Sequence, residues 1–103
     1  MAKKSKNADI IRELKLAVYE TYHLPVTLDD QFDQFLTDML RYYYEIPSHT
    51  NDVVRVIRKA LREKGVAKDL KESNVYDEEL ENVLLKWQGD TKFDVVSWTR
   101  LLS

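Results

Sequence analysis

Four cationic residues in the middle of the chain have the types and the spacing to contact phosphate groups. They lie in the stretch PSHTNDVVRVIRKALREKGV, residues 47–66, and are Arg55, Arg58, Lys59 and Arg62. At about 100° per residue they fall opposite Val53 and Ile57, so the sequence predicts a single cationic stripe on one side of a helix. Side chains in such a stripe can follow a nucleic-acid backbone and neutralise its phosphates.

Two other roles for this stripe remain open. It can be a solvated face that pairs weakly with nearby acids, since runs of charged residues are most often solvated. It can also bind an acidic protein partner, since arginine forks match carboxylates. The charge distribution fits all three roles: residues 27–45 hold five acids and one base, residues 55–71 seven bases and two acids, and residues 72–90 six acids and one base.

The segment LTDMLRYYYEIPSHTNDVVRVIRKALREKGV, residues 36–66, resembles the helix-turn-helix of bacterial regulators. An apolar leading helix, a break at Pro47 and a second helix closing at Gly65 carry the resemblance, which covers about thirty residues. The break lacks the usual glycine and is longer than three or four residues. Asp52, near the start of the second helix, would repel phosphate, so the resemblance implies contacts with the phosphate backbone and little base readout.

The usual patterns of enzymes and metal sites are missing from the sequence. There are no cysteines, and two glycines cannot build a phosphate-binding loop. The two histidines, His23 and His49, have neither the spacing of a metal pair nor a separated nucleophile to activate. We therefore predict a non-enzymatic protein with no catalytic residue, no metal site and no cofactor.

Apolar residues that lie off the expected helix stripes suggest a second function. Tyr19, Tyr44 and Leu85 are residues of this kind, and Trp98, on one apolar side of the last helix, is of a type that anchors protein interfaces. The last helix is apolar on two sides, which predicts either burial between other helices or a homodimer through the C-terminal helix. The leading prediction is a nucleic-acid-binding regulator, and the alternative is a protein-binding adaptor, inhibitor or immunity-type factor.

Five helical segments must position these residues. The chain has 103 residues, two glycines and two prolines, which favours an all-α, bundle-like single domain with a helix-turn-helix-like pair in the middle. We expect a flexible basic N-terminus over residues 1–7 and one helical domain over residues 8–103. No apolar run is long enough to span a membrane, and the absence of a signal sequence predicts a cytoplasmic protein without a membrane partner.

Capping patterns place the predicted helix boundaries. Thr27, Asn74 and Thr91 are each followed three residues later by an aspartate, which predicts helices that begin directly after these three residues. The first helix is expected over residues 8–24, and the third is expected to end before Gly65. Gly89 is expected to end the fourth helix.

Overall fold

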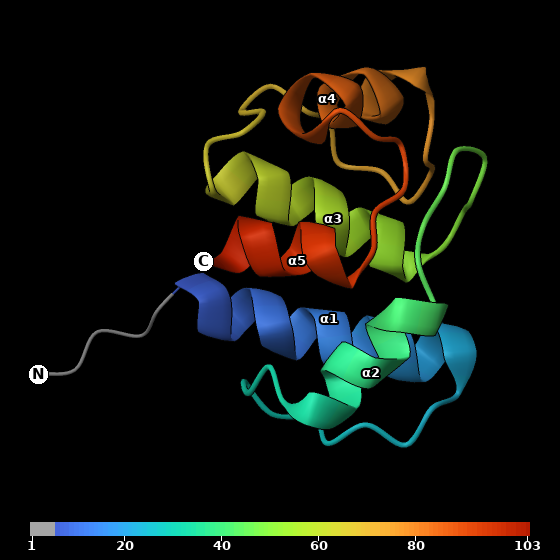
Figure 1. Cartoon of the computed structure of the whole chain (residues 1–103), viewed down its shortest axis with the longest axis vertical. Coiled ribbons are helices and arrows are strands. Elements are labelled where there is room, and N and C mark those ends of the chain that lie inside the picture. The colour runs from blue at the N-terminus through green and yellow to red at the C-terminus, as the bar shows by residue number, and fades with distance from the viewer. Residues whose placement is uncertain (1–5) are drawn as a thin grey trace, which may run out of the picture.

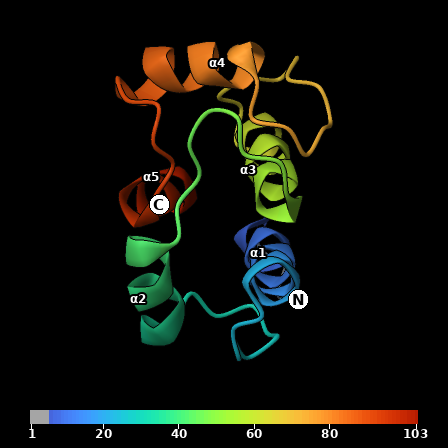
Figure 2. The same ribbon diagram turned by 90° about the vertical axis from the view of Figure 1, so that its right-hand side faces the viewer.

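The computed structural model describes residues 6–103. It contains two pairs of packed helices and a fifth helix that lies across one end of both pairs. The helices are α1 (Lys6–Tyr22), α2 (Gln34–Tyr42), α3 (Asp52–Glu63), α4 (Glu78–Gln88) and α5 (Val95–Leu102) (Figure 1). Helix α1 packs against α3, α2 packs against α5, and α4 lies across one end of both pairs (Figure 2). The radius of gyration, 12.9 Å, is that of one compact domain of this length. The predicted all-α domain of five helices is confirmed.

Helix α3 contributes more buried residues to the core than any other helix. The four residues predicted to face inward are all buried: Val53, Ile57, Ala60 and Leu61. Val54 and Val56 are buried as well, because α1 covers one side of α3 and the connection to α4 covers another. The helix is therefore enclosed on more sides than its amphipathic pattern predicted.

Three helices begin later than the capping patterns predicted. The N-cap residues are Asp33 for α2, Asp77 for α4 and Asp94 for α5, and each accepts a hydrogen bond from a backbone N–H of the first turn. In α5 the cap is reciprocal, because Ser97 also bonds the backbone of Asp94. An aspartate side chain satisfies a free amide and favours the positive end of the helix dipole. The predicted caps at Thr27, Asn74 and Thr91 were therefore wrong.

The helix ends agree better with the sequence. Gly65 and Gly89 follow α3 and α4 with φ of 80° and 76°, a left-handed conformation that glycine adopts without a steric penalty. Helix α1 ends at Tyr22, two residues before its predicted end, and His23 has a φ of 57°. At the other end, Lys6 and Asn7 already belong to α1, whereas residues 1–5 of the predicted flexible segment lie outside the described residues.

The pair α2 and α3 does not form a helix-turn-helix unit. Nine residues, 43–51, separate the two helices, and the packing partners are α5 for α2 and α1 for α3. The connection is fixed by two isolated antiparallel bridges, Glu45 with Phe93 and Thr50 with Val75. A recognition helix presents its outer side to a groove, whereas the polar side of α3 is partly covered and its Arg58 is buried.

A buried carboxylate holds the connection between α2 and α3. The side chain of Glu45 is buried and accepts hydrogen bonds from Tyr22 Oη at 2.5 Å and from Asn51 Nδ2 at 2.8 Å. His49 Nδ1 lies 3.1 Å from the same carboxylate. Burial and the hydrogen bond to Glu45 raise the pKa of the Tyr22 phenol above its ordinary value. These contacts engage His49 in the fold and join the end of α1 to the N-cap of α3.

A buried lysine holds the connection between α1 and α2. Lys15 is buried, and its Nζ lies 2.5 Å from Asp29 Oδ1 and 2.9 Å from Asp33 Oδ2. Burial opposes the charged ammonium, but the hydrogen bonds and charges of the two aspartates raise the Lys15 pKa above 10.5. The Lys15 hydrogen bond lowers the pKa of Asp29, and a hydrogen bond from the Leu36 amide, with that from Lys15, lowers the pKa of Asp33. We call Lys15, Asp29 and Asp33 the clamp. It keeps residues 24–33 out of a helix.

Replacing Lys15 with methionine is expected to make the free energy of unfolding less dependent on pH in the acidic range. A carboxylate whose pKa is lowered by folding stabilises the fold above its unfolded pKa, here 3.8, and this stabilisation is lost as pH falls through the folded pKa. Lys15→Met should therefore be less stable than the wild type at pH 7, and the difference should narrow below about pH 3.8. Urea denaturation followed by circular dichroism at several pH values measures this difference in the free energy of unfolding.

The half-exposed Arg12 provides the matched control for Lys15. Its guanidinium lies 3.6 Å from Asp30 Oδ2 and 3.5 Å from Asp9 Oδ1, and exposed pairs contribute little to stability. Arg12→Met should therefore change stability less than Lys15→Met at pH 7. An equal loss of stability for Lys15→Met at pH 7 and pH 3 would contradict the ionic role of the clamp.

Candidate functional site

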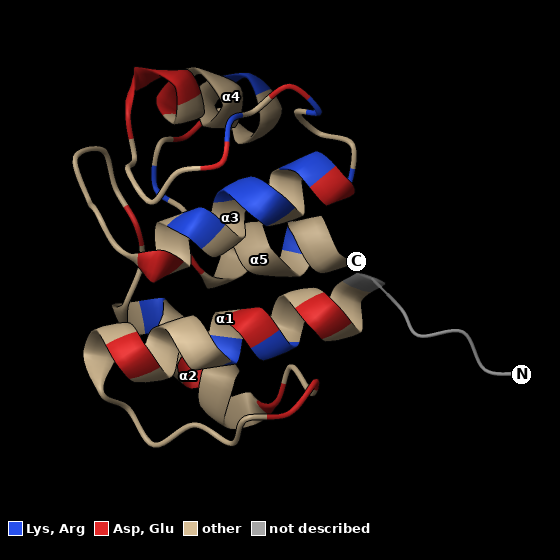
Figure 3. Ribbon diagram, turned by 180° about the vertical axis from the view of Figure 1, so that it is seen from behind, with Lys and Arg blue, Asp and Glu red and all other residues tan. Residues whose placement is uncertain are grey.

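The predicted cationic stripe on α3 is divided among acids of the same chain. Arg55 Nη1 lies 3.6 Å from Glu13 Oε1, and Arg55 Nε lies 3.7 Å from Asp52 Oδ1. Lys59 Nζ contacts the other oxygen of Glu13 and lies 3.9 Å from Glu63 Oε2. Figure 3 shows the basic positions of α3 in blue and the acidic positions of α1 in red on neighbouring helices. A phosphate would have to compete with these carboxylates for both cations.

Arg58 is not on the surface, so its predicted place in the stripe was wrong. Its side chain is 0% exposed and crosses beneath the connection between α3 and α4. The guanidinium donates to the carbonyl oxygens of Lys71 and Val75 and to the carboxylates of Asp77 and Glu79, at 2.7 to 3.2 Å. These bonds pair the buried charge and satisfy carbonyl groups that no strand or helix engages.

Arg62, the fourth predicted contact, is half-buried. Its Nη1 donates to the carbonyl oxygen of Leu70 at 3.2 Å, and Leu70 itself is buried in the core. Arg62 therefore also helps to hold the connection after α3. The four cations do not form one accessible stripe, because Arg58 is enclosed and the other three are partly covered and engaged.

The four residues predicted for protein interaction separate into three surface residues and one core residue. Tyr19, Leu85 and Tyr44 are exposed by 48%, 45% and 37%, and Lys92 Nζ lies 5.0 Å from the centre of the Tyr44 ring. Trp98 is buried, with its ring edge-on to Phe93 at a centroid distance of 5.0 Å. Of the two alternatives for the last helix, burial between other helices therefore holds for its Trp98 side, and Trp98 does not lie on an interaction surface.

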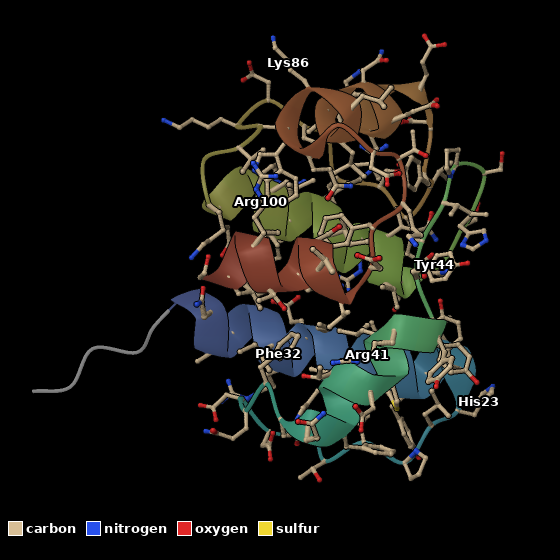
Figure 4. The ribbon with its side chains drawn as sticks, in the orientation of Figure 1. His23, Phe32, Arg41, Tyr44, Lys86 and Arg100 are labelled. Atoms are coloured by element: carbon tan, nitrogen blue, oxygen red, sulfur yellow. The ribbon has the colours of Figure 1, made fainter. Side chains whose placement is uncertain are left out.

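A hollow between α2 and α5 combines apolar and cationic side chains. It has a volume of about 410 Å³ and continues past Thr99 into a second hollow of about 250 Å³. We call this surface the α2/α5 groove and define it by six of its lining residues: Phe32, Arg41, Val95, Val96, Thr99 and Arg100. Val96 is 70% exposed, unusually high for a valine. Phe32 just before α2, Arg41 on α2 and Arg100 on α5 lie on the face toward the viewer in Figure 4.

The two arginines of the groove lack acidic partners within the described part of the chain. Both are exposed, and neither guanidinium lies within 4.0 Å of a carboxylate among residues 6–103. Arg100 rests 5.0 Å from the centre of the Trp87 ring, a cation–π contact that positions the guanidinium and leaves its charge unneutralised. Two nearby acids are engaged elsewhere, since Asp38 on α2 accepts a hydrogen bond from Gln34 at 2.8 Å and Asp94 caps the start of α5.

Comparison of the chain with protein-family models, curated proteins and solved structures gives no significant match. Function must therefore be argued from the side chains. Within residues 6–103 no three histidine, cysteine or acidic side chains are grouped to hold a metal ion. None of the helices described is both long and apolar enough to cross a bilayer.

The sequence carried partial signals for the groove. Val96 lies off the Val95–Trp98–Leu102 stripe of the last helix, and Arg41 is the one base among residues 27–45. Neither signal identifies a site alone, because α2 and α5 are far apart in sequence and meet only in the fold. Arg100 and Phe32 carried no signal that distinguished them from ordinary surface residues.

Proposed function

We propose that this chain is a non-enzymatic protein-binding module that docks its partner in the α2/α5 groove. The observation that carries the proposal is the pairing of an exposed apolar surface around Val96 with two arginines that have no acidic partner in the described chain. Arginine is enriched among the residues that contribute most to protein interfaces, and apolar contacts beside it exclude water. The groove would be the centre of an interface, since stable complexes bury about 800 Å² on each partner.

Nucleic-acid binding through α3, the leading prediction from the sequence, has weaker support. Three of its four cations contact acids of the same chain, and Arg58 is enclosed. Binding phosphates would require breaking these contacts. The free energy gained by releasing each counterion from the nucleic acid would then be offset by the loss of an ion pair within the protein. The groove needs no such rearrangement because its arginines are already accessible.

The proposed function is tested by placing a photo-crosslinking amino acid at Val96 in the full chain, in cells that naturally express it. A side chain that is 70% exposed tolerates this replacement. We expect a covalent adduct with one discrete protein, identified by mass spectrometry. Arg41→Glu should reduce the adduct yield about tenfold, because it replaces a cation of the groove with an acid.

The same crosslinker at the exposed Glu72, in the connection between α3 and α4, is the matched control. Two outcomes would overturn the proposal: no protein adduct specific to position 96, or an adduct that nuclease treatment removes. A protein adduct that is insensitive to Arg41→Glu would place the partner elsewhere on the surface.

A further inference from the structure

The walls of the α2/α5 groove restrict the backbone conformation of its occupant. The larger hollow lies between α2 and α5, whose backbone groups are paired internally apart from their ends, and Phe32, from the non-helical segment before α2, lines the second hollow. The isolated bridges of the described chain, at Glu45 and Thr50, lie outside the residues that line the groove. An extended peptide would find no strand edge to pair with and would leave backbone groups unpaired as it lost water. A helix brings its own hydrogen bonds and needs only side-chain contacts.

The length of the groove matches a short helix. Helix α5 has eight residues and is therefore about 12 Å long. A partner helix of two to three turns would cover this length with three or four apolar residues at i, i+3, i+4 and i+7. The exposed Val96 and the partly buried Val95 and Phe32 are the apolar surface that such a stripe would cover.

The arginines determine the charge of the occupant. Arg41 comes from α2 and Arg100 from α5, so one cation stands on each wall of the groove. A helix lying between them would therefore carry acids on both edges of its apolar stripe. The whole chain has a net charge of −2 and does not attract acids at long range, so recognition must come from close contacts inside the groove.

From these three restrictions we infer that the α2/α5 groove binds an amphipathic helix of another protein, with an apolar stripe bordered by Glu or Asp on both sides. The inference rests on the proposed function and specifies the chemistry of its partner. Arg41 and Arg100 select the acidic borders, and Val96 lies under the stripe.

A direct test uses synthetic helices and the full chain. The probe is a fluorescein-labelled, hydrocarbon-stapled peptide of about 14 residues with leucines at i, i+3, i+4 and i+7 and glutamates on both borders. Matched peptides carry lysines in place of the glutamates, or a central proline in place of the staple. Fluorescence anisotropy measures the Kd of each peptide for the wild type and for two charge-reversed variants, Arg41→Glu with Arg100→Glu, and Lys68→Glu with Lys71→Glu.

The acidic helix should bind at least tenfold more tightly than the lysine helix and the proline peptide. The groove double variant should weaken this binding about tenfold or more, because two charge-assisted contacts become repulsive. The lysine control changes the net charge equally at exposed residues away from the groove and should change the Kd less than twofold. Thermal melting of both variants establishes that they fold.

Equal affinity for acidic and basic helices, or no effect of the groove variant, would overturn the inference. If Val96 crosslinks to a protein in cells but the acidic helix does not bind, the proposed function stands and the inferred chemistry is wrong. If both experiments fail, both are wrong. Self-association in sedimentation that Val96→Glu abolishes would instead assign the groove to a second copy of this chain. Salt-sensitive binding of a labelled duplex that Arg41→Glu abolishes would assign it to nucleic acid.

Discussion

Replacing Arg58 with alanine is expected to lower the free energy of unfolding by about 3 to 4 kcal/mol. The guanidinium is fully enclosed and makes five hydrogen bonds that join α3 to the connection before α4 and to the first turn of α4. Its loss leaves the carbonyl oxygens of Lys71 and Val75 without a donor and opens a cavity above α3. The two carboxylates are half-exposed and regain water, which limits the loss. Urea denaturation at pH 7 measures the change.

Two further substitutions make the Arg58 prediction specific. Arg58→Lys should recover less than half of the lost stability, because an ammonium group has three donors and cannot reproduce the planar fork. Arg41→Ala removes an exposed arginine without an acidic partner in the described chain and should change stability by less than about 0.5 kcal/mol. A loss below about 1 kcal/mol for Arg58→Ala would mean that the guanidinium is solvated, and would return it to the cationic surface predicted from the sequence.

The error over Arg58 shows what a helical pattern can and cannot predict. The pattern placed Val53, Ile57 and Leu61 inward, and all three are buried. It placed Arg58 outward because residues on the opposite side of an amphipathic helix are usually solvated. Periodicity describes one helix at a time and contains no information on what covers its polar side. Here the segment between α3 and α4 covers it, and the unpaired carbonyl groups of that segment require a buried donor.

The helix starts show a similar limit at the local level. The pattern of a polar residue followed three positions later by aspartate fits two different N-caps, since aspartate caps a helix as well as threonine does. Local propensity could not choose between Thr91 and Asp94 as the cap of α5. For α2 the choice comes from tertiary contacts, because Lys15 on α1 binds Asp29 and Asp33 in the preceding segment, which is not helical.

The groove could not be found from sequence spacing, whereas the type of fold could. The scarcity of glycine and the five amphipathic segments predict an all-α domain without any knowledge of packing. The groove instead requires that Arg41 and Arg100, 59 positions apart in the chain, stand on opposite walls of one hollow. That juxtaposition depends on the pairing of α2 with α5 rather than with α3, its neighbour in sequence.

Replacing Trp98 with alanine is expected to lower the free energy of unfolding by about 3 to 5 kcal/mol. The indole is almost fully enclosed, meets the Phe93 ring edge-on at 5.0 Å and belongs to the same core as Leu80 and Leu101. Truncation removes the largest side chain of α5 and leaves a cavity that the surrounding helices cannot fill without moving. Chemical denaturation followed by circular dichroism measures the loss, and Trp98→Phe should recover part of it.

Val96 separates the stability role of α5 from its proposed binding role. It lies two residues before Trp98 on the same helix but is 70% exposed, so Val96→Glu should change stability by less than about 0.5 kcal/mol. The same change should weaken binding of the acidic helix, since it places a like charge beneath the partner's stripe. If Trp98→Ala were as stable as the wild type and lost binding, the indole would be an interface anchor and α5 would be oriented differently. If only Val96→Glu loses binding in a stable fold, the outer side of α5 is the docking surface.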